Sequence, residues 1–168
     1  MRNILAGTII VFLSIAGCQA SQQATQYEKR IGDIDFDPKS DDKNFELCYP
    51  NTIQQYFAFT SDKCFTDYKP YIDSVFFASY RSIPLKESGL IRIRFVVNCK
   101  GQTDRFRLLA MNMRYEPMRF NKRITSQLLS IIKSIKVWQV QMVNGQPVDY
   151  YQYLIFKIRN GQLIEILP

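Results

Sequence analysis

The chain has 168 residues, about the length of one domain, and 46% of them are hydrophobic, so it can build a core. It contains no histidine, which excludes His general bases, Ser-His-Asp or Cys-His catalysis and His-ligated metal sites. Residues 19–88 hold 8 basic and 11 acidic side chains, whereas residues 89–168 hold 13 and 4. We expect no enzyme, no cofactor and no metal site, although a basic half can also indicate nucleic-acid binding.

The N-terminus has the pattern of a signal segment. A basic start is followed by an apolar run over residues 4–15, and Ala16 and Gly17 then precede Cys18. The run is too short for a spanning helix of roughly 20 residues but suits a secretory signal. Small residues before a cysteine resemble the bacterial lipobox, so we predict a lipoprotein signal peptide over residues 1–17 and acylation of Cys18. The alternative is a secreted protein cut near Ala20.

The lipid predicts a location and a class of partner. Acyl chains on Cys18 would hold the protein stably on a bilayer. Gln19 stands where an aspartate would favour the inner membrane, by a sorting rule borrowed from lipoproteins as a class. We therefore expect a lipid-anchored protein of the bacterial outer membrane, on its periplasmic or surface face. Its partner would be an outer-membrane or periplasmic protein, and an exported protein rarely meets nucleic acid.

Residues 18–44 are polar and show no sustained period, so we predict a flexible tether, followed by a single domain over residues 45–168. With Cys18 acylated, three cysteines remain and at most one intramolecular disulfide can form. Cys99 lies in a predicted turn of the sheet. We expect Cys48 or Cys64 to pair with Cys99 and to staple the irregular lead-in to the sheet.

The elements expected after this lead-in give an α+β fold. Helical spacing of apolar residues over 68–80 predicts a short helix, with Pro70 in its first turn. Alternation predicts strands over 90–97, 103–109 and 150–158, with a return strand over 163–167 after Asn160 and Gly161. A helix is predicted over 120–135. The fold class is a mainly antiparallel sheet of three to four strands with a helix packed on one face.

Two sets of residues are predicted on the outward face of this sheet. In any register that matches inward Ile and Phe side chains, the outward face takes Arg92, Arg94, Arg105 and Arg107. Like charges on adjacent strands are unfavourable, so we expect cation–π contacts with tyrosines or an anionic partner to offset them. On the strand over 150–158 the outward residues are Tyr151, Tyr153, Ile155 and Lys157.

Four elements in this order resemble the C-terminal domain of TonB over residues 89–167. They are the glycine-bounded strand 89–101, the helix running into Trp138, the Asn-Gly-Gln-Pro-Val segment 144–148 and the strand 154–158. The resemblance implies an interaction module, linked to TonB-dependent outer-membrane transport, that binds an extended peptide along the edge of its last long strand. The matching positions here run from Tyr151 to Ile158.

Two alternatives stay open for this function. The strand 163–167 could cap the edge, which would leave nothing to recruit a peptide. The arginine face could instead bind anionic envelope components, as in a structural or surface-binding lipoprotein.

Overall fold

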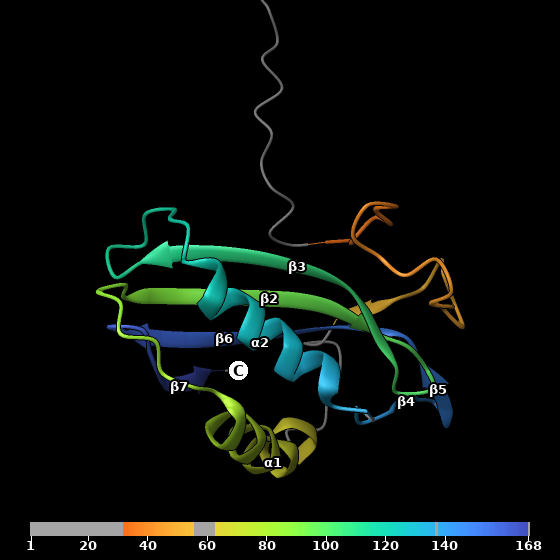
Figure 1. Cartoon of the computed structure of the whole chain (residues 1–168). Helices are drawn as coiled ribbons and strands as arrows, with labels where there is room; N and C mark the ends of the chain where they lie inside the picture. Colours follow the sequence, from red (N-terminus) through yellow and green to blue (C-terminus); the bar gives the residue numbers. More distant parts are fainter. Residues whose placement is uncertain (1–31, 56–62, 137, 168) are drawn as a thin grey trace, which may run out of the picture.

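The computed structural model describes residues 32–55, 63–136 and 138–167, and it confirms an α+β fold. A mixed sheet of five strands has the order β1-β6-β2-β3, and β7 also pairs with β6. A separate hairpin contains β4 and β5. Figure 1 shows β3 at one outer edge of the sheet, with α2 crossing in front of the strands and α1 beyond β7. The strands are β1 (Gln54–Gln55), β2 (Gly89–Val97), β3 (Thr103–Asn112), β4 (Gln141–Val143), β5 (Gln146–Val148), β6 (Tyr150–Arg159) and β7 (Gln162–Leu167).

The predicted long strands are present, and the sheet is larger than expected. β2 pairs antiparallel with β3 and with β6, and β7 returns antiparallel along β6 after Asn160 and Gly161. The additional strand β1 runs parallel to β6 and has two residues, while β4 and β5 have three each. Elements this short cannot show a period in the sequence, which is why they were not predicted.

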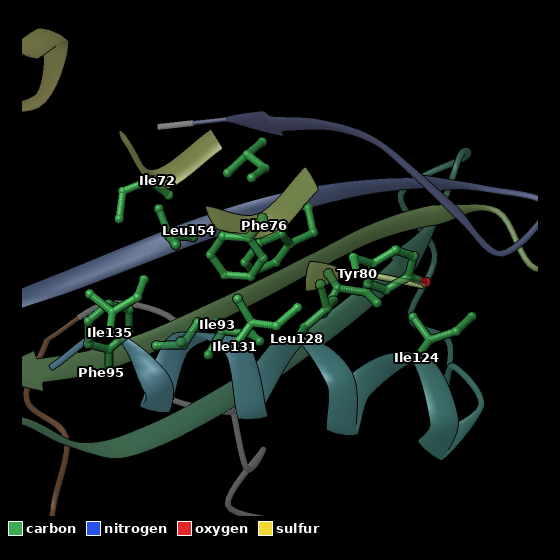
Figure 2. Packing of buried hydrophobic residues seen from close by; sticks show 14 of the residues in the cluster. Ile72, Phe76, Tyr80, Ile93, Phe95, Ile124, Leu128, Ile131, Ile135 and Leu154 are labelled. Carbon is green, nitrogen blue, oxygen red and sulfur yellow. The ribbon is translucent and has the colours of Figure 1, made fainter. Parts of the chain in front are cut away.

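Both helices pack on one face of the sheet. The buried face of α2 (Lys122–Ser134) contributes Ile124, Leu128, Ile131 and Ile132. These side chains belong to one core with Ile91, Ile93 and Phe95 of β2 and Leu154, Phe156 and Ile158 of β6. Figure 2 shows part of this core, with Leu128 and Ile131 of α2 near Ile93 of β2. The ring of Trp138 lies edge-on to Phe95 with 4.8 Å between the ring centres, so this residue, four positions after the end of α2, closes the core.

The helix α1 (Lys63–Ser79) begins earlier than predicted. Pro70 is therefore inside the helix and not in its first turn, which corrects the sequence interpretation. The predicted apolar stripe holds for Ile72, Phe76 and Tyr80, which are buried, whereas Tyr71 of the same stripe is exposed. The helix continues through Pro70 because Ile72 and Phe76 anchor it to the core on the following turns.

The segment predicted as a tether is in part folded against the sheet. From Gly32 onward it lies across the face opposite the helices, where Ile34 is buried against Val96 and Tyr151. Phe45 and Leu47 pack on the same small cluster. We call residues 32–47 the strap. Residues 32–44, which were predicted as part of the tether, therefore pack on the sheet.

Candidate interaction site

The arginine face forms as predicted, and the structure places both predicted sets of outward residues on it. In the register of β2 and β6, Arg94 lies opposite Tyr153, and Arg92 lies opposite Ile155. Arg107 pairs with Arg94 on the other side. A bulge between these strands places Arg105 at φ 58°, in the left-handed region, and its side chain still reaches this face.

Tyrosine rings and the strap offset the charge of these arginines. The guanidinium carbon of Arg92 lies 4.6 Å from the centre of the Tyr153 ring, and that of Arg94 lies 5.5 Å from the Tyr151 ring. These contacts confirm the cation–π expectation. The strap adds backbone acceptors: Arg94 donates to the carbonyl of Gly32 at 2.7 Å, and Arg105 to that of Ile34 at 3.1 Å. Burial lowers the pKa values of Arg92 and Arg94 from their ordinary value.

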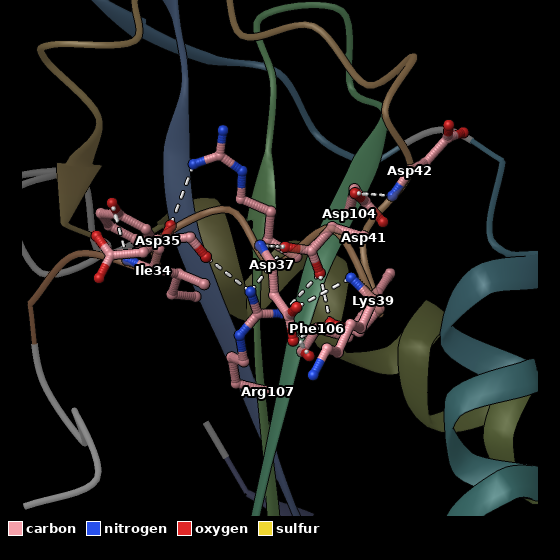
Figure 3. Close-up of polar contacts among 12 residues, drawn as sticks. Ile34, Asp35, Asp37, Lys39, Asp41, Asp42, Asp104, Phe106 and Arg107 are labelled. Atoms are coloured by element: carbon pink, nitrogen blue, oxygen red, sulfur yellow. Dashed lines mark hydrogen bonds and ion pairs between the residues drawn. The ribbon is translucent and has the colours of Figure 1, made fainter. Parts of the chain in front are cut away.

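Arg107 is held by the strap's own acidic turn, as Figure 3 shows. Its two terminal nitrogens donate to the two carboxylate oxygens of Asp41 at 2.7 Å each, a bidentate pair. The same guanidinium donates to the carbonyl of Asp35 at 2.7 Å. Asp41 also accepts from the backbone N–H of Asp37, which closes the turn. The anionic partner considered for this face is thus provided by the chain itself.

We expect the Asp41–Arg107 pair to stabilise the fold in an acid-sensitive way. Burial of Asp41, whose side chain is 1% exposed, is the largest single influence and opposes ionisation. The hydrogen bonds from Arg107, from the backbone N–H of Asp37 and from Ser40, together with the charge of Arg107, outweigh burial and hold the pKa of Asp41 below the ordinary 3.8. A lower pKa in the folded state means that this stabilisation is complete above pH 3.8 and is lost as the pH falls through the folded-state pKa. The substitution Asp41→Asn should lower the free energy of unfolding by about 2 kcal/mol at neutral pH.

Urea unfolding of wild type and Asp41→Asn over a series of pH values measures this effect. The gap between the two proteins should shrink as the pH falls below 3.8. Glu116→Gln is the matched control, because its partner Arg114 is 80% exposed and such surface pairs contribute little. An equal loss of unfolding free energy in Asp41→Asn and Glu116→Gln would contradict the role given to Asp41.

A disulfide joins the end of the strap to the β2–β3 turn. Of the two pairings left open, the structure has Cys48 bonded to Cys99, so the predicted staple is confirmed. The carboxylate of Asp149 is fully buried beside it and accepts from the backbone N–H of Tyr49 at 2.6 Å and from that of Cys99 at 2.8 Å. The sulfur atoms and an Asp149 oxygen lie within 4.8 Å of one another, but the sulfurs are bonded to each other and do not form a thiolate site.

The edge expected to receive a peptide is occupied by the domain itself. β7 pairs with β6 over Ile155–Arg159, and β1 pairs with Tyr150 and Tyr151. Between them, the N–H of Tyr153 donates to the side-chain oxygen of Gln152 at 2.8 Å. On its other side β6 pairs with β2 along most of its length. The structure therefore favours the capping alternative over strand addition at Tyr151–Ile158.

The outer edge of β3 differs from that of β6. At its end, Ala110 accepts from the N–H of Met118, and the N–H of Asn112 donates to Glu116. Since alternate residues of a strand direct their backbone groups to the same side, Leu108 directs its N–H and C=O outward as well. Within the described part of the chain, no hydrogen bond joins Leu108 to anything on that side. Its side chain is 39% exposed.

Two hollows lie on either side of this edge, and Leu108 and Leu109 line both. One, of about 410 Å³, lies on the strap face between residues 33–37 and the side chains of Arg92, Arg94 and Arg107. The other, of about 550 Å³, lies on the helix face. Its walls are Pro117, Met118, Arg119, Phe120 and Thr125. We call them the strap-side hollow and the helix-side hollow.

Sequence reasoning did not identify the strap or the β3 edge. The opposite net charges of residues 19–88 and 89–168 were a signal that the two parts could pair, as Asp41 and Arg107 do. No signal marked the β3 edge, because an exposed Leu in an alternating strand has the same pattern as a buried one. The predicted signal peptide and the lipidation site Cys18 lie outside the described residues, and the burial of the Cys64 side chain is not described.

Among the residues that the structure describes, no helix has the length and hydropathy needed to cross a membrane. The chain matches no protein-family model, no curated protein and no solved structure. The resemblance to the TonB C-terminal domain therefore rests on the four sequence elements alone.

Proposed function

We propose that the protein is a non-enzymatic lipoprotein of the bacterial cell envelope, anchored to the outer membrane through acylated Cys18. Its domain acts as an interaction module for an outer-membrane or periplasmic protein. The pattern of residues 1–18 supports the anchor. The open outer edge of β3 at Leu108 is the observation that carries the interaction role, because an exposed apolar edge strand is a template for pairing with another chain.

The other edges of the sheet are poorer templates. Both residues of β1, Gln54 and Gln55, are glutamines, so this edge offers no apolar side chain to a partner strand. β7 shifts register against β6, so Ile164 lies between Leu163 and Glu165 without a partner position. Bulges of this kind interrupt edge pairing in natural sheets. On β3 the bulge lies at Arg105, before Leu108, and the segment from Leu108 to Ala110 is regular.

The second function considered, binding of anionic envelope components by the arginine face, has weaker support. The guanidinium groups of Arg94, Arg105 and Arg107 donate to carbonyls of the strap, and Arg107 pairs with Asp41. An external anion would have to displace these bonds. A link to TonB-dependent transport is supported by the sequence resemblance and by no contact in the structure.

Photo-crosslinking in cells tests the proposed function. A photoreactive amino acid at Leu108 of the full chain, with its signal segment, should trap a distinct envelope protein that mass spectrometry identifies. The same residue at Ile164 is the matched control, since Ile164 is 40% exposed and Leu108 39%. Both side chains therefore sample the solvent equally, and the β3 edge alone should yield the adduct.

Equal adducts from both positions would indicate collisions in the envelope and would contradict a β3 site. A third position, Arg94, distinguishes the weaker alternative. A strong adduct there with none at Leu108 would move the function to the arginine face.

A further inference from the structure

The surroundings of the β3 edge indicate which kind of segment it would bind. This inference rests on the proposed function and concerns the chemistry of the partner. The open part of the edge is short, because the bulge at Arg105 precedes it and the bond from Met118 to Ala110 ends it. Within it, the N–H and C=O of Leu108 and the N–H of Ala110 face outward. These groups suffice for an incoming strand of a few residues.

The alternation of an added strand would use both hollows. A partner residue directly opposite Leu108 places its side chain on the same face as Leu108, the helix side. There the helix-side hollow offers Pro117, Met118 and Phe120, an apolar wall. The residues before and after it project to the strap side, where Ile34, Phe36 and Leu109 line the hollow together with Arg107. The helix-side hollow thus takes one apolar side chain, and its neighbours on the strap side meet a mixed apolar and charged lining.

The charge next to the apolar wall is positive. Residues 108–123 include Arg114, Arg119, Lys122 and Arg123 but one acidic residue, Glu116. Glu116 pairs with Arg114 at 3.0 Å. Within the described residues, Arg119, Lys122 and Arg123 form no ion pair, and Arg119 lines the helix-side hollow itself. Glu87, the other carboxylate in contact with this region, accepts from the N–H of Asn121.

We infer that the outer edge of β3 binds an extended, acidic segment of a partner protein. One apolar side chain of that segment occupies the helix-side hollow opposite Leu108. A carboxylate two residues along, on the same face, lies beside Arg119. The main-chain bonds of Leu108 supply the affinity, and the apolar wall and Arg119 supply the preference for one sequence over another.

Fluorescence anisotropy with short synthetic peptides tests this partner chemistry. The probe peptide consists of threonines around one central valine, with one glutamate two residues after the valine. We expect it to bind the purified chain about tenfold more tightly than the same peptide with lysine in place of glutamate. The difference should shrink at high salt, since exposed charges are screened. With Arg119→Glu the preference should reverse, whereas Lys136→Glu, an exposed lysine beyond α2, should leave it unchanged.

Two changes test whether the peptide adds as a strand. If the peptide adds antiparallel to β3, N-methylation of the valine removes the N–H that bonds to Leu108 and should abolish binding, whereas N-methylation of the next residue, whose N–H faces solvent, should have little effect. A parallel strand would reverse these two results. In the protein, Leu108→Pro removes the outward N–H at an edge position where proline is tolerated, and Leu108→Ala retains it. Because the methylated peptides leave the protein unaltered, their result stands even if Leu108→Pro fails to fold.

The outcomes separate this inference from the proposed function. Lysine and glutamate peptides that bind equally would overturn the acidic partner. An adduct at Leu108 in cells would still stand in that case and would keep the interaction module. Binding that both N-methylated peptides retain would overturn strand addition, and the absence of both peptide binding and a cellular adduct would overturn the module as well.

Discussion

Replacing Gly161 by alanine should destabilise the domain by about 3 kcal/mol or more, whereas the same change at Gly145 should cost about 1 kcal/mol. The two glycines follow asparagines in equivalent turns. Asn160 and Gly161 have φ values of 48° and 72°, and Asn144 and Gly145 have 50° and 77°. The left-handed conformation therefore imposes the same cost on an alanine at either position. Any difference between the variants comes from what surrounds the turn.

Gly161 is a docking point for the chain between α1 and β2. Its carbonyl accepts from the N–H of Ile83 and from the hydroxyl of Tyr80, and its N–H donates to the carbonyl of Glu87. A Cβ atom at Gly161 would lie 1.8 Å from the carbonyl oxygen of Ile83, a backbone atom that cannot rotate away. At Gly145 no atom lies within 4 Å of such a Cβ.

Urea unfolding followed by circular dichroism measures both variants. If Gly161→Ala and Gly145→Ala lowered the free energy of unfolding by similar amounts, the segment from Tyr80 to Glu87 would be able to move away from the turn at little cost. That result would contradict the docking role of Gly161.

Removal of the Cys48–Cys99 disulfide should cost about 4 kcal/mol. The bonded cysteines are 51 residues apart, and closing a loop of that length restricts the unfolded chain by about this amount. The folded state should change little, since Asp149 still accepts from Tyr49 and Cys99, and the side chain of Asn98 still donates to the carbonyl of Glu46. The melting temperature should therefore fall by about 10 °C, while the sheet is retained in the folded state.

Thermal unfolding of Cys48→Ser combined with Cys99→Ser tests this expectation. Both substitutions are made in a Cys64→Ser background, which removes the third thiol and prevents disulfide exchange. The control is Cys64→Ser alone, in which the bond between Cys48 and Cys99 remains. A variant that loses its sheet signal already at room temperature would show that the staple shapes the native state as well as the unfolded one.

The two-residue period of the long strands made one face of the sheet predictable. Ile91, Ile93 and Phe95 alternate with Arg92 and Arg94, so any antiparallel pairing had to place the arginines together. Pairing with β6 then brought Arg92 over Tyr153, as the outward alternation of both strands required. The bulge at Arg105 was not predictable, because an extra residue in one strand leaves the composition of that strand unchanged.

The strap could not be predicted from the sequence for a different reason. Arg94 and Arg105 bond to the carbonyl oxygens of Gly32 and Ile34, and every residue has such an oxygen. Asp41 is the specific contact, but Asp33, Asp35, Asp37 and Asp42 surround it and look alike in the sequence. Which acid reaches Arg107 depends on the turn closed by the bond between Asp37 and Asp41.

The order of bonds along the strap has a mechanical consequence. A chain pulled from its N-terminal side loads the bond between Gly32 and Arg94 first, then that of Ile34, and later the pair of Asp41 and Arg107. Because each of these bonds is loaded in turn, they break one after another at low force. The covalent link between Cys48 and Cys99 stops the peeling, because it carries the tension from the strap directly to the β2–β3 turn. A pull on the chain ahead of residue 32 therefore detaches the strap before it loads the sheet.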